Sequence, residues 1–171
     1  MLTEDQFIQY YEKLARAHKT IAHDPAGVKS FFEIEDPDEL GDFDKALRGK
    51  VGSTVLFIFA GDGELDDHDS NNHVQTIVCY LYIMQKKTDT ISSANIRSNC
   101  ITIVNDLLAR TKTDIRAGFI VPGRPVTFRI DGIPVGQVGP ISLQWYGYAV
   151  KVTFRCPFAA RSESGTWTDI P

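Results

Sequence analysis

The fold is decided by residues 51–84, whose sequence is VGSTVLFIFAGDGELDDHDSNNHVQTIVCYLYIM. Two runs in it, Thr54–Ala60 and Val74–Met84, are rich in β-branched and aromatic residues, which pack well on a pleated surface. An acidic stretch, Gly61–Asn72, lies between them and is dominated by turn-forming residues. We therefore predict a strand, an acidic loop and a second strand, around which the rest of the chain is organised.

The second strand is apolar on both of its faces, because side chains alternate between the two faces of a strand. A strand of this kind must be covered on both sides. The helices of one small domain cover one face, so the other face needs a second layer or a neighbouring subunit. The two predicted faces are Thr76, Val78, Tyr80, Tyr82 and Met84 on one side and Ile77, Cys79, Leu81 and Ile83 on the other.

Three segments show helical signals. Thr3 and Gln6 form a capping-box pattern before apolar residues at helical spacing, which predicts a helix from about Glu4 to Ala22. A cap at Asp36 followed by proline at the first helical position predicts a second helix to about Arg48. A third, amphipathic helix is predicted over Ser92–Arg110.

Shorter signals complete the chain. Lys29–Ile34 suits a short strand, and Val126–Ile130 alternates like a half-exposed strand. Glycine and proline over 132–136 predict a turn. A last strand is predicted over Ile141–Phe154, and the change of its apolar face near Gly147 predicts a bulge there.

Together these elements predict an α+β fold, with a mixed or antiparallel sheet and helices packed mainly on one face. Residues 1–158 are expected to form one domain, in which 1–50 supply a helical part and 51–158 supply the sheet and the long helix. Residues 159–171 are polar and are expected to form a tail.

The composition limits the function. A chain of 171 residues with 43% hydrophobic residues suits one ordinary core. A net charge of −4 provides no basic footprint for nucleic acid. No run of 18 apolar residues is present and the start lacks a signal-peptide pattern, so neither a membrane partner nor secretion is expected. The three cysteines, at 79, 100 and 156, are expected to be reduced core residues of a cytosolic protein.

The charges are unevenly distributed along the chain. Residues 1–70 carry 16 acidic and 7 basic residues, whereas residues 71–171 carry 6 acidic and 11 basic residues. If the two halves form different surfaces, copies of the chain can meet head to tail, acidic against basic. If the halves interleave in the fold, the asymmetry cancels.

No catalytic constellation is found, and we expect neither an enzyme nor a cofactor. The acidic loop does not fit a calcium-binding pattern, because the sixth and twelfth positions counted from Asp62 are Asp67 and His73 rather than glycine and glutamate. The four histidines and three cysteines have no zinc-like spacing. The cluster Trp145, Tyr146 and Tyr148 has little basic company, which favours a core or an interface over base stacking.

The layout resembles the tail terminator proteins of long-tailed bacteriophages and related contractile injection particles. The resemblance covers about residues 50–157 and the first helix. It rests on topology and spacing, in the order strand, variable loop, long strand, amphipathic helix and a final pair of strands. The matching segments are Thr54–Ala60, Gly61–Asn72, Val74–Met84, Ser92–Arg110, and Val126–Ile130 with Ile141–Phe154.

The resemblance implies a ring-forming structural protein of the virion, assembled in the cytoplasm of a bacterial host. Such proteins cap the tail tube and join it to the head connector, so the implied partners are further copies of the chain, tube or connector proteins, and DNA that passes through the lumen. The predicted interface comprises Thr76, Val78, Tyr80, Tyr82, Trp145, Tyr146 and Tyr148. The acidic residues predicted to face the lumen are Asp62, Glu64, Asp66, Asp67 and Asp69.

Two alternatives stay open at this point. The first is a small cytosolic module that binds a peptide or small ligand on its sheet face. The second is an enzyme with a metal held by the acidic loop. A ring of defined copy number, a closed apolar pocket, or tight binding of a divalent cation would distinguish the three.

Overall fold

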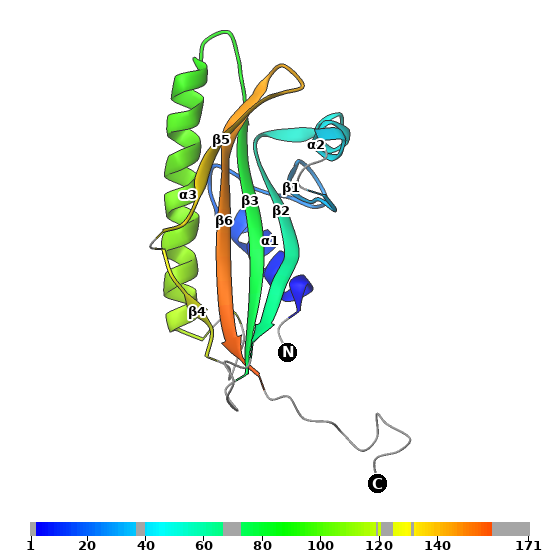
Figure 1. The fold of residues 1–171 in the computed structure, drawn as a ribbon. Coiled ribbons are helices and arrows are strands. Elements are labelled where there is room, and N and C mark those ends of the chain that lie inside the picture. Colours follow the sequence, from blue (N-terminus) through cyan, green and yellow to red (C-terminus); the bar gives the residue numbers. More distant parts are fainter. Residues whose placement is uncertain are drawn as a thin grey trace.

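A computed structural model describes residues 3–36, 40–66, 73–118, 120, 125–130 and 132–158. This part of the chain forms three helices and six strands (Figure 1). Their order is α1 (Glu4–Ala17), β1 (Lys29–Glu33), α2 (Leu40–Leu47), β2 (Val51–Asp66), β3 (Val74–Lys86), α3 (Ser93–Arg116), β4 (Thr127–Phe128), β5 (Val135–Ile141) and β6 (Trp145–Pro157).

The strands form one open, mixed sheet with the order β1-β2-β3-β6-β4. β1 runs parallel to β2, and every other described pair is antiparallel. β5 and β4 pair with opposite ends of β6, on the edge of β6 that faces away from β3. The predicted α+β class with a mixed sheet is confirmed.

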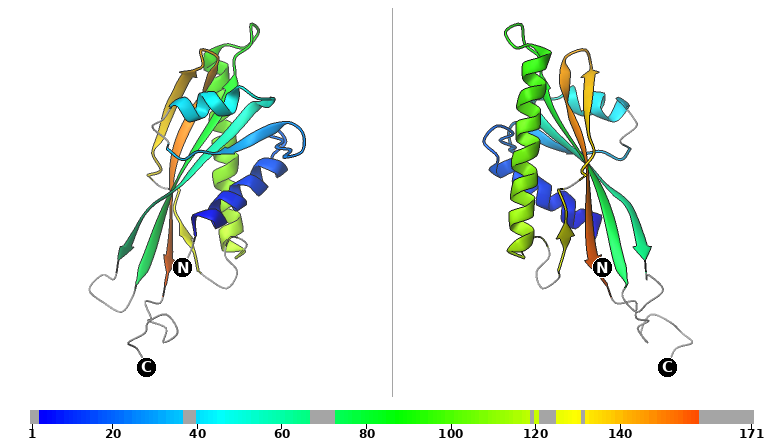
Figure 2. Two further views of the ribbon diagram at one scale, coloured as in Figure 1. Left: turned by 90° about the vertical axis from the view of Figure 1, so that its right-hand side faces the viewer. Right: turned by 60° about the vertical axis from the view of Figure 1, so that its left-hand side comes forward.

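Helices α1 and α3 cover one face of the sheet, as Figure 2 shows from two sides. Their apolar side chains pack against the inward residues of β2, β3 and β6 in the main core. The two helices also contact each other, since the Tyr10 hydroxyl donates to Asp114 over 3.1 Å. We call the opposite face, away from these two helices, the outer face. The prediction that helices lie mainly on one face is confirmed.

Helix α2 lies on the outer face and covers only one end of it. Phe43 of α2 is 1% exposed and its ring centroid lies 4.7 Å from that of Phe57. A second, smaller core forms beneath it. Its buried members are Ile34, Phe43, Val55, Phe57, Met84, Ile141 and Trp145.

Several element boundaries differ from the sequence prediction. α1 ends at Ala17, because the next residue, His18, has extended backbone angles. α3 continues to Arg116, since Thr111 and Asp114 extend its buried side toward α1. β1 confirms the short strand predicted over Lys29–Ile34. Among the described helices, none is long and apolar enough to cross a membrane.

The C-terminal strands correct three predictions. The alternating segment Val126–Ile130 contains a strand of only two residues, β4. The single strand predicted over Ile141–Phe154 is a hairpin, in which Ser142 and Leu143 turn the chain between β5 and β6 with positive φ angles. The turn predicted over 132–136 therefore ends where β5 begins, at Val135.

The bulge predicted at Gly147 is absent, because the pairing of β6 with β3 is continuous. The apolar pattern changes there because the helix-covered face of β6 is buried along the strand, whereas its outer face is covered only at the Trp145 end. Trp145 points into the second core on the outer face, whereas Val150, Val152 and Phe154 point into the main core. The irregularity lies in the partner strand, where the register of β5 shifts between Val138 and Ile141.

Candidate interaction surface

The outer face is only half covered. β3 alternates regularly, with residues of the helix-covered face buried and Val74, Thr76, Val78, Tyr80 and Tyr82 partly exposed. α2 and the β5–β6 hairpin shield the end near Tyr82 and Met84. At the other end no described element lies over the strands. The surface there contains Thr76, Val78 and Tyr80.

The seven residues predicted as an interface do not form one surface. Thr76, Val78 and Tyr80 lie together on the uncovered half, whereas Tyr82 packs edge-on against Phe43 at a centroid distance of 5.1 Å. Trp145 is 3% exposed inside the second core, so it is a core residue rather than a contact residue.

Tyr146 and Tyr148 lie on the opposite face, packed against the main core. The Arg97 guanidinium lies 5.6 Å from the centroid of the Tyr146 ring. The sheet separates these two tyrosines from the uncovered patch, which lies on its outer face. Trp145 points to that outer face as well, because neighbouring residues of one strand point to opposite sides. The sequence cluster of three aromatics is therefore divided between two cores.

The acidic loop is shorter than predicted, because β2 continues to Asp66. A bulge between Ala60 and Gly63 adds one residue to β2 without ending its pairing with β3. Glu64 lies opposite Thr76 and Asp66 opposite Val74, which places both acids on the outer face. The five acids predicted to face the lumen therefore do not lie in one loop. The backbone of Asp62 lies in the bulge, and Glu64 and Asp66 lie in the strand. Asp67 and Asp69 lie outside the described residues.

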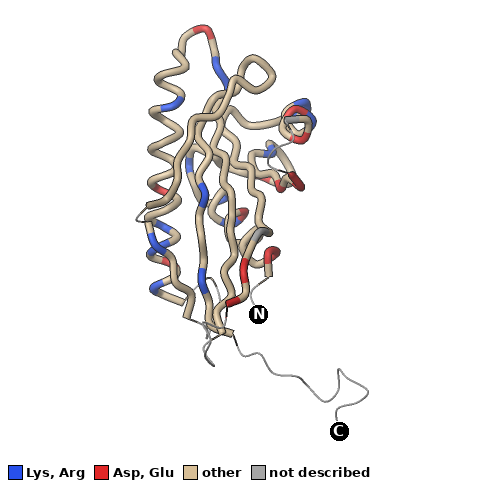
Figure 3. Tube along the Cα trace, in the orientation of Figure 1, with Lys and Arg blue, Asp and Glu red and all other residues tan. Residues whose placement is uncertain are grey.

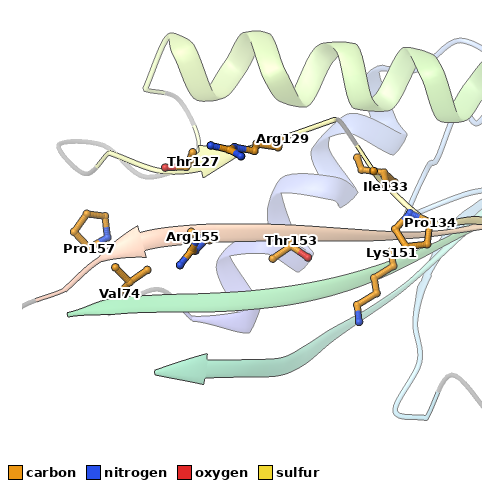
Figure 4. Close-up of a pocket in the computed structure, with 10 residues that line it drawn as sticks. Val74, Thr127, Arg129, Ile133, Pro134, Lys151, Thr153, Arg155 and Pro157 are labelled. Carbon is orange, nitrogen blue, oxygen red and sulfur yellow. The ribbon is translucent and has the colours of Figure 1, made fainter. Parts of the chain in front are cut away.

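A groove of about 520 Å³ lies on the uncovered half of the outer face, between β4 and β6 (Figure 4). Arg129 extends from the segment after β4, and Lys151 and Arg155 extend from β6. The Lys151 ammonium lies 5.6 Å from the centroid of the Tyr80 ring. We call this hollow the basic groove. Its lining is Val74, Thr127, Arg129, Gly132, Ile133, Pro134, Lys151, Thr153, Arg155 and Pro157.

Lys151 and Arg155 are the basic residues that follow the aromatic cluster in sequence, but the groove that they line is not predictable from that sequence. Arg129 alternates with Thr127 in the predicted strand 126–130, and that alternation was the available signal. Thr127 pairs with Arg155 across 28 residues of sequence. Only this pairing brings the third cation beside the other two.

The opposite edge of the same end of the sheet is acidic. The end of β2 and the start of α1 line a second hollow of about 550 Å³, which includes Glu4, Asp5, Glu64 and Leu65. Leu65 is 59% exposed. In Figure 3, acidic positions follow the end of β2 and the start of α1, and basic positions follow β6 and the C-terminal end of α3. We call Glu64, Leu65 and Asp66 the β2 tip.

Outside this surface, few of the described side chains have the geometry or the pKa of a reactive centre. In the described part of the chain, no group of three histidine, cysteine, aspartate or glutamate residues is arranged to hold a metal ion. The three cysteines are buried, as predicted, and none of them forms a disulfide in the described part of the chain. Burial raises the pKa of Cys79 and of Cys100 to about 12, which keeps both thiols protonated near neutral pH.

Comparison with known proteins adds no family. No protein-family model matches the chain, and the search of curated proteins found no match.

Proposed function

We propose that this chain is a ring-forming structural protein of the virion. It acts as a tail terminator or head–tail joining component of a phage or phage-like contractile particle. The observation that carries the proposal is the half-covered outer face, where apolar side chains of the central strands lie open at one end of the sheet. A second copy of the chain is the partner that covers them.

The uncovered patch has the chemistry of an interface. Val78 and Tyr80 are partly exposed on a central strand, where the regular pairing on both sides makes the surface rigid. A rigid surface loses little conformational entropy when a partner packs on it. Aromatic residues on such surfaces commonly provide much of the binding energy.

The charges favour a ring over a symmetric dimer. A two-fold dimer brings the same patch of both copies together, whereas a ring joins two different patches. Here the acidic and basic residues lie at opposite edges of the sheet, so unlike edges attract and like edges repel. Beyond further copies, the partners proposed are the tail tube and the head connector, with DNA passing through the lumen.

The basic groove also favours a second candidate, a binding module for a small anionic ligand or acidic peptide. The groove combines cations with apolar residues, which is typical of ligand sites. In that case the protein is a monomer, and the ligand rather than another copy covers the sheet.

The test is the absolute mass in solution, measured by light scattering behind a sizing column, with negative-stain images of the peak. We expect rings, either spontaneously or after tail-tube protein is added. A monomer that stays a monomer with tube protein would overturn the proposal and leave the binding module.

A matched pair of variants locates the interface. Val78→Asp places a charge in the uncovered patch, whereas Leu143→Asp makes the same change at an 85% exposed residue in the β5–β6 turn, near the α2 end of the sheet. We expect Val78→Asp to yield monomers and Leu143→Asp to retain rings. Circular dichroism of both variants checks that each is folded, and rings from a folded Val78→Asp protein would contradict the assignment.

A further inference from the structure

The basic groove and the β2 tip are complementary surfaces on one molecule. We propose that the basic groove of one copy receives the β2 tip of the next copy. This inference rests on the proposed ring and names the two surfaces that would join its subunits.

The groove gathers three positively charged side chains in one hollow. Arg129 and Lys151 are exposed, and Arg155 adds a third cation to the same hollow. Among the described residues that line the groove, none is acidic. The remaining lining includes aliphatic carbon from Val74, Ile133 and Pro134, so the groove offers apolar contact as well as charge.

The β2 tip presents the complementary features. Glu64 is exposed and shares the outer face with Asp66. Leu65, between these two acids in sequence, pairs with Gln75 and therefore points to the opposite face, where it is 59% exposed. Two carboxylates at an exposed sheet edge match a groove lined by cations.

A copy cannot fill its own groove with its own β2 tip. Gly63 to Asp66 are paired with β3, which lies between β2 and β6 in the sheet. The row Glu64, Thr76, Arg155 and Thr127 crosses four neighbouring strands, which corresponds to about 14 Å between its ends. Both surfaces lie on the outer face with β3 between them, so the backbone of the β2 tip can enter only the groove of another copy.

The tip is also accessible at the edge of the sheet. β1 pairs with β2 only through Val51 and Leu56–Ile58, so beyond these positions β2 is the last described strand on its side. A contact between an edge and a groove on the opposite edge is heterologous, and it repeats until the assembly closes into a ring.

A second copy fits the groove better than nucleic acid does. The cations are interleaved with aliphatic residues and threonines rather than forming a continuous stripe. The acidic residues of the β2 tip lie on the same face and would repel a phosphate backbone. The net charge of −4 acts in the same direction.

The test uses two charge-reversal variants of the full chain. The groove variant is Arg129→Glu with Lys151→Glu, and the tip variant is Glu64→Lys with Asp66→Lys. We expect each variant alone to self-associate at least about tenfold more weakly than the natural chain, because like charges then meet at the contact. An equimolar mixture should recover assembly in which the two variants alternate, since each contact between unlike variants again joins opposite charges.

The matched control for the groove variant is Lys112→Glu with Arg116→Glu at the C-terminal end of α3. It makes the same change in net charge outside the groove, and we expect it to assemble normally. Sedimentation velocity at several salt concentrations measures the association constants. Association of the natural chain should weaken as salt rises, because salt screens charges at an accessible contact.

The outcomes separate this inference from the proposed function. Rings that persist in both reversal variants would overturn the inference and leave the ring intact. A natural chain that stays monomeric even with tube protein would overturn both. Two further results would also overturn the inference: binding of a labelled DNA duplex that is lost in the groove variant, or assembly that is lost only when residues 159–171 are removed.

Discussion

At the scale of single residues, His23 shows how burial determines a protonation state. The Ser30 backbone N–H donates to Nδ1 of His23 over 3.0 Å, and Nε2 lies 3.5 Å from Oε1 of Glu12. The neutral ring, protonated on Nε2, satisfies both contacts. Burial lowers the pKa of His23 below its ordinary value of 6.5, and the positive charge of Arg16 acts in the same direction, although Glu12 opposes them.

The lowered pKa of His23 predicts acid sensitivity. Because the unfolded chain binds this proton more readily than the folded chain, stability is present above about pH 6.5 and decreases as the pH falls below it. His23→Asn retains an acceptor bonded to Cγ, as Nδ1 is, for the Ser30 N–H but does not titrate, so its unfolding free energy should change less between pH 7 and 5. Urea denaturation at several pH values measures this, and equal pH dependence in both proteins would refute it.

Gly147 illustrates a glycine required by close approach. A Cβ at this position would lie 1.8 Å from the backbone oxygen of Ile83 in β3. We predict that Gly147→Ala lowers the free energy of unfolding by at least about 2 kcal/mol, because β6 and β3 must move apart. The control is Gly136→Ala, where a Cβ meets nothing within 4 Å. Equal melting temperatures of the two variants in thermal unfolding would contradict the prediction.

At the scale of elements, α2 determines which part of the outer face is available. Its Phe43 seals the second core against Phe57 and Tyr82, and the end of the sheet beyond it stays uncovered. The α1–α3 pair on the other side is joined by polar groups as well as apolar ones. Asp114 accepts from both Tyr10 and Arg110, which positions the two helices along each other.

Removing the Phe43 side chain tests the role of α2. We expect Phe43→Ala to lower the free energy of unfolding by about 3–5 kcal/mol, because it leaves a cavity above Phe57. In a Trp167→Phe background, Trp145 is the only tryptophan and reports on the same core. Its fluorescence should shift to longer wavelength when α2 no longer shields it. An unchanged spectrum and stability would show that α2 does not seal this core.

At the scale of the whole molecule, the proposed ring links stability to concentration. Only folded copies assemble, so assembly stabilises the folded state. The melting temperature should therefore rise with protein concentration. We expect this rise between protein concentrations of about 1 and 100 times the dissociation constant. At the upper end, assembly adds about 2.7 kcal/mol to the free energy of unfolding. Calorimetry at several concentrations measures it.

The groove variant Arg129→Glu with Lys151→Glu is the control for that measurement. Its melting temperature should rise less with concentration than that of the natural chain, because its copies associate more weakly. A natural chain with a constant melting temperature over the same range would contradict assembly.

The sequence by itself was sufficient to predict the elements that local chemistry determines. The two faces of β3 follow from a period of two, and the apolar stripe of α3 follows from a period of 3.6. The buried cysteines and the α+β class also follow from local patterns. These predictions were correct because they depend on neighbouring residues along one element.

Only the tertiary structure decided where each face is covered. Trp145 becomes a core residue because α2, about 100 residues earlier in the chain, packs over it. The basic groove exists because Arg129 is placed beside β6 by strand pairing. The acidic stretch belongs to β2 because β3 continues to pair with it beyond the bulge. In each case the deciding contact joins residues far apart in sequence, and no local pattern of apolar and polar residues records such a contact.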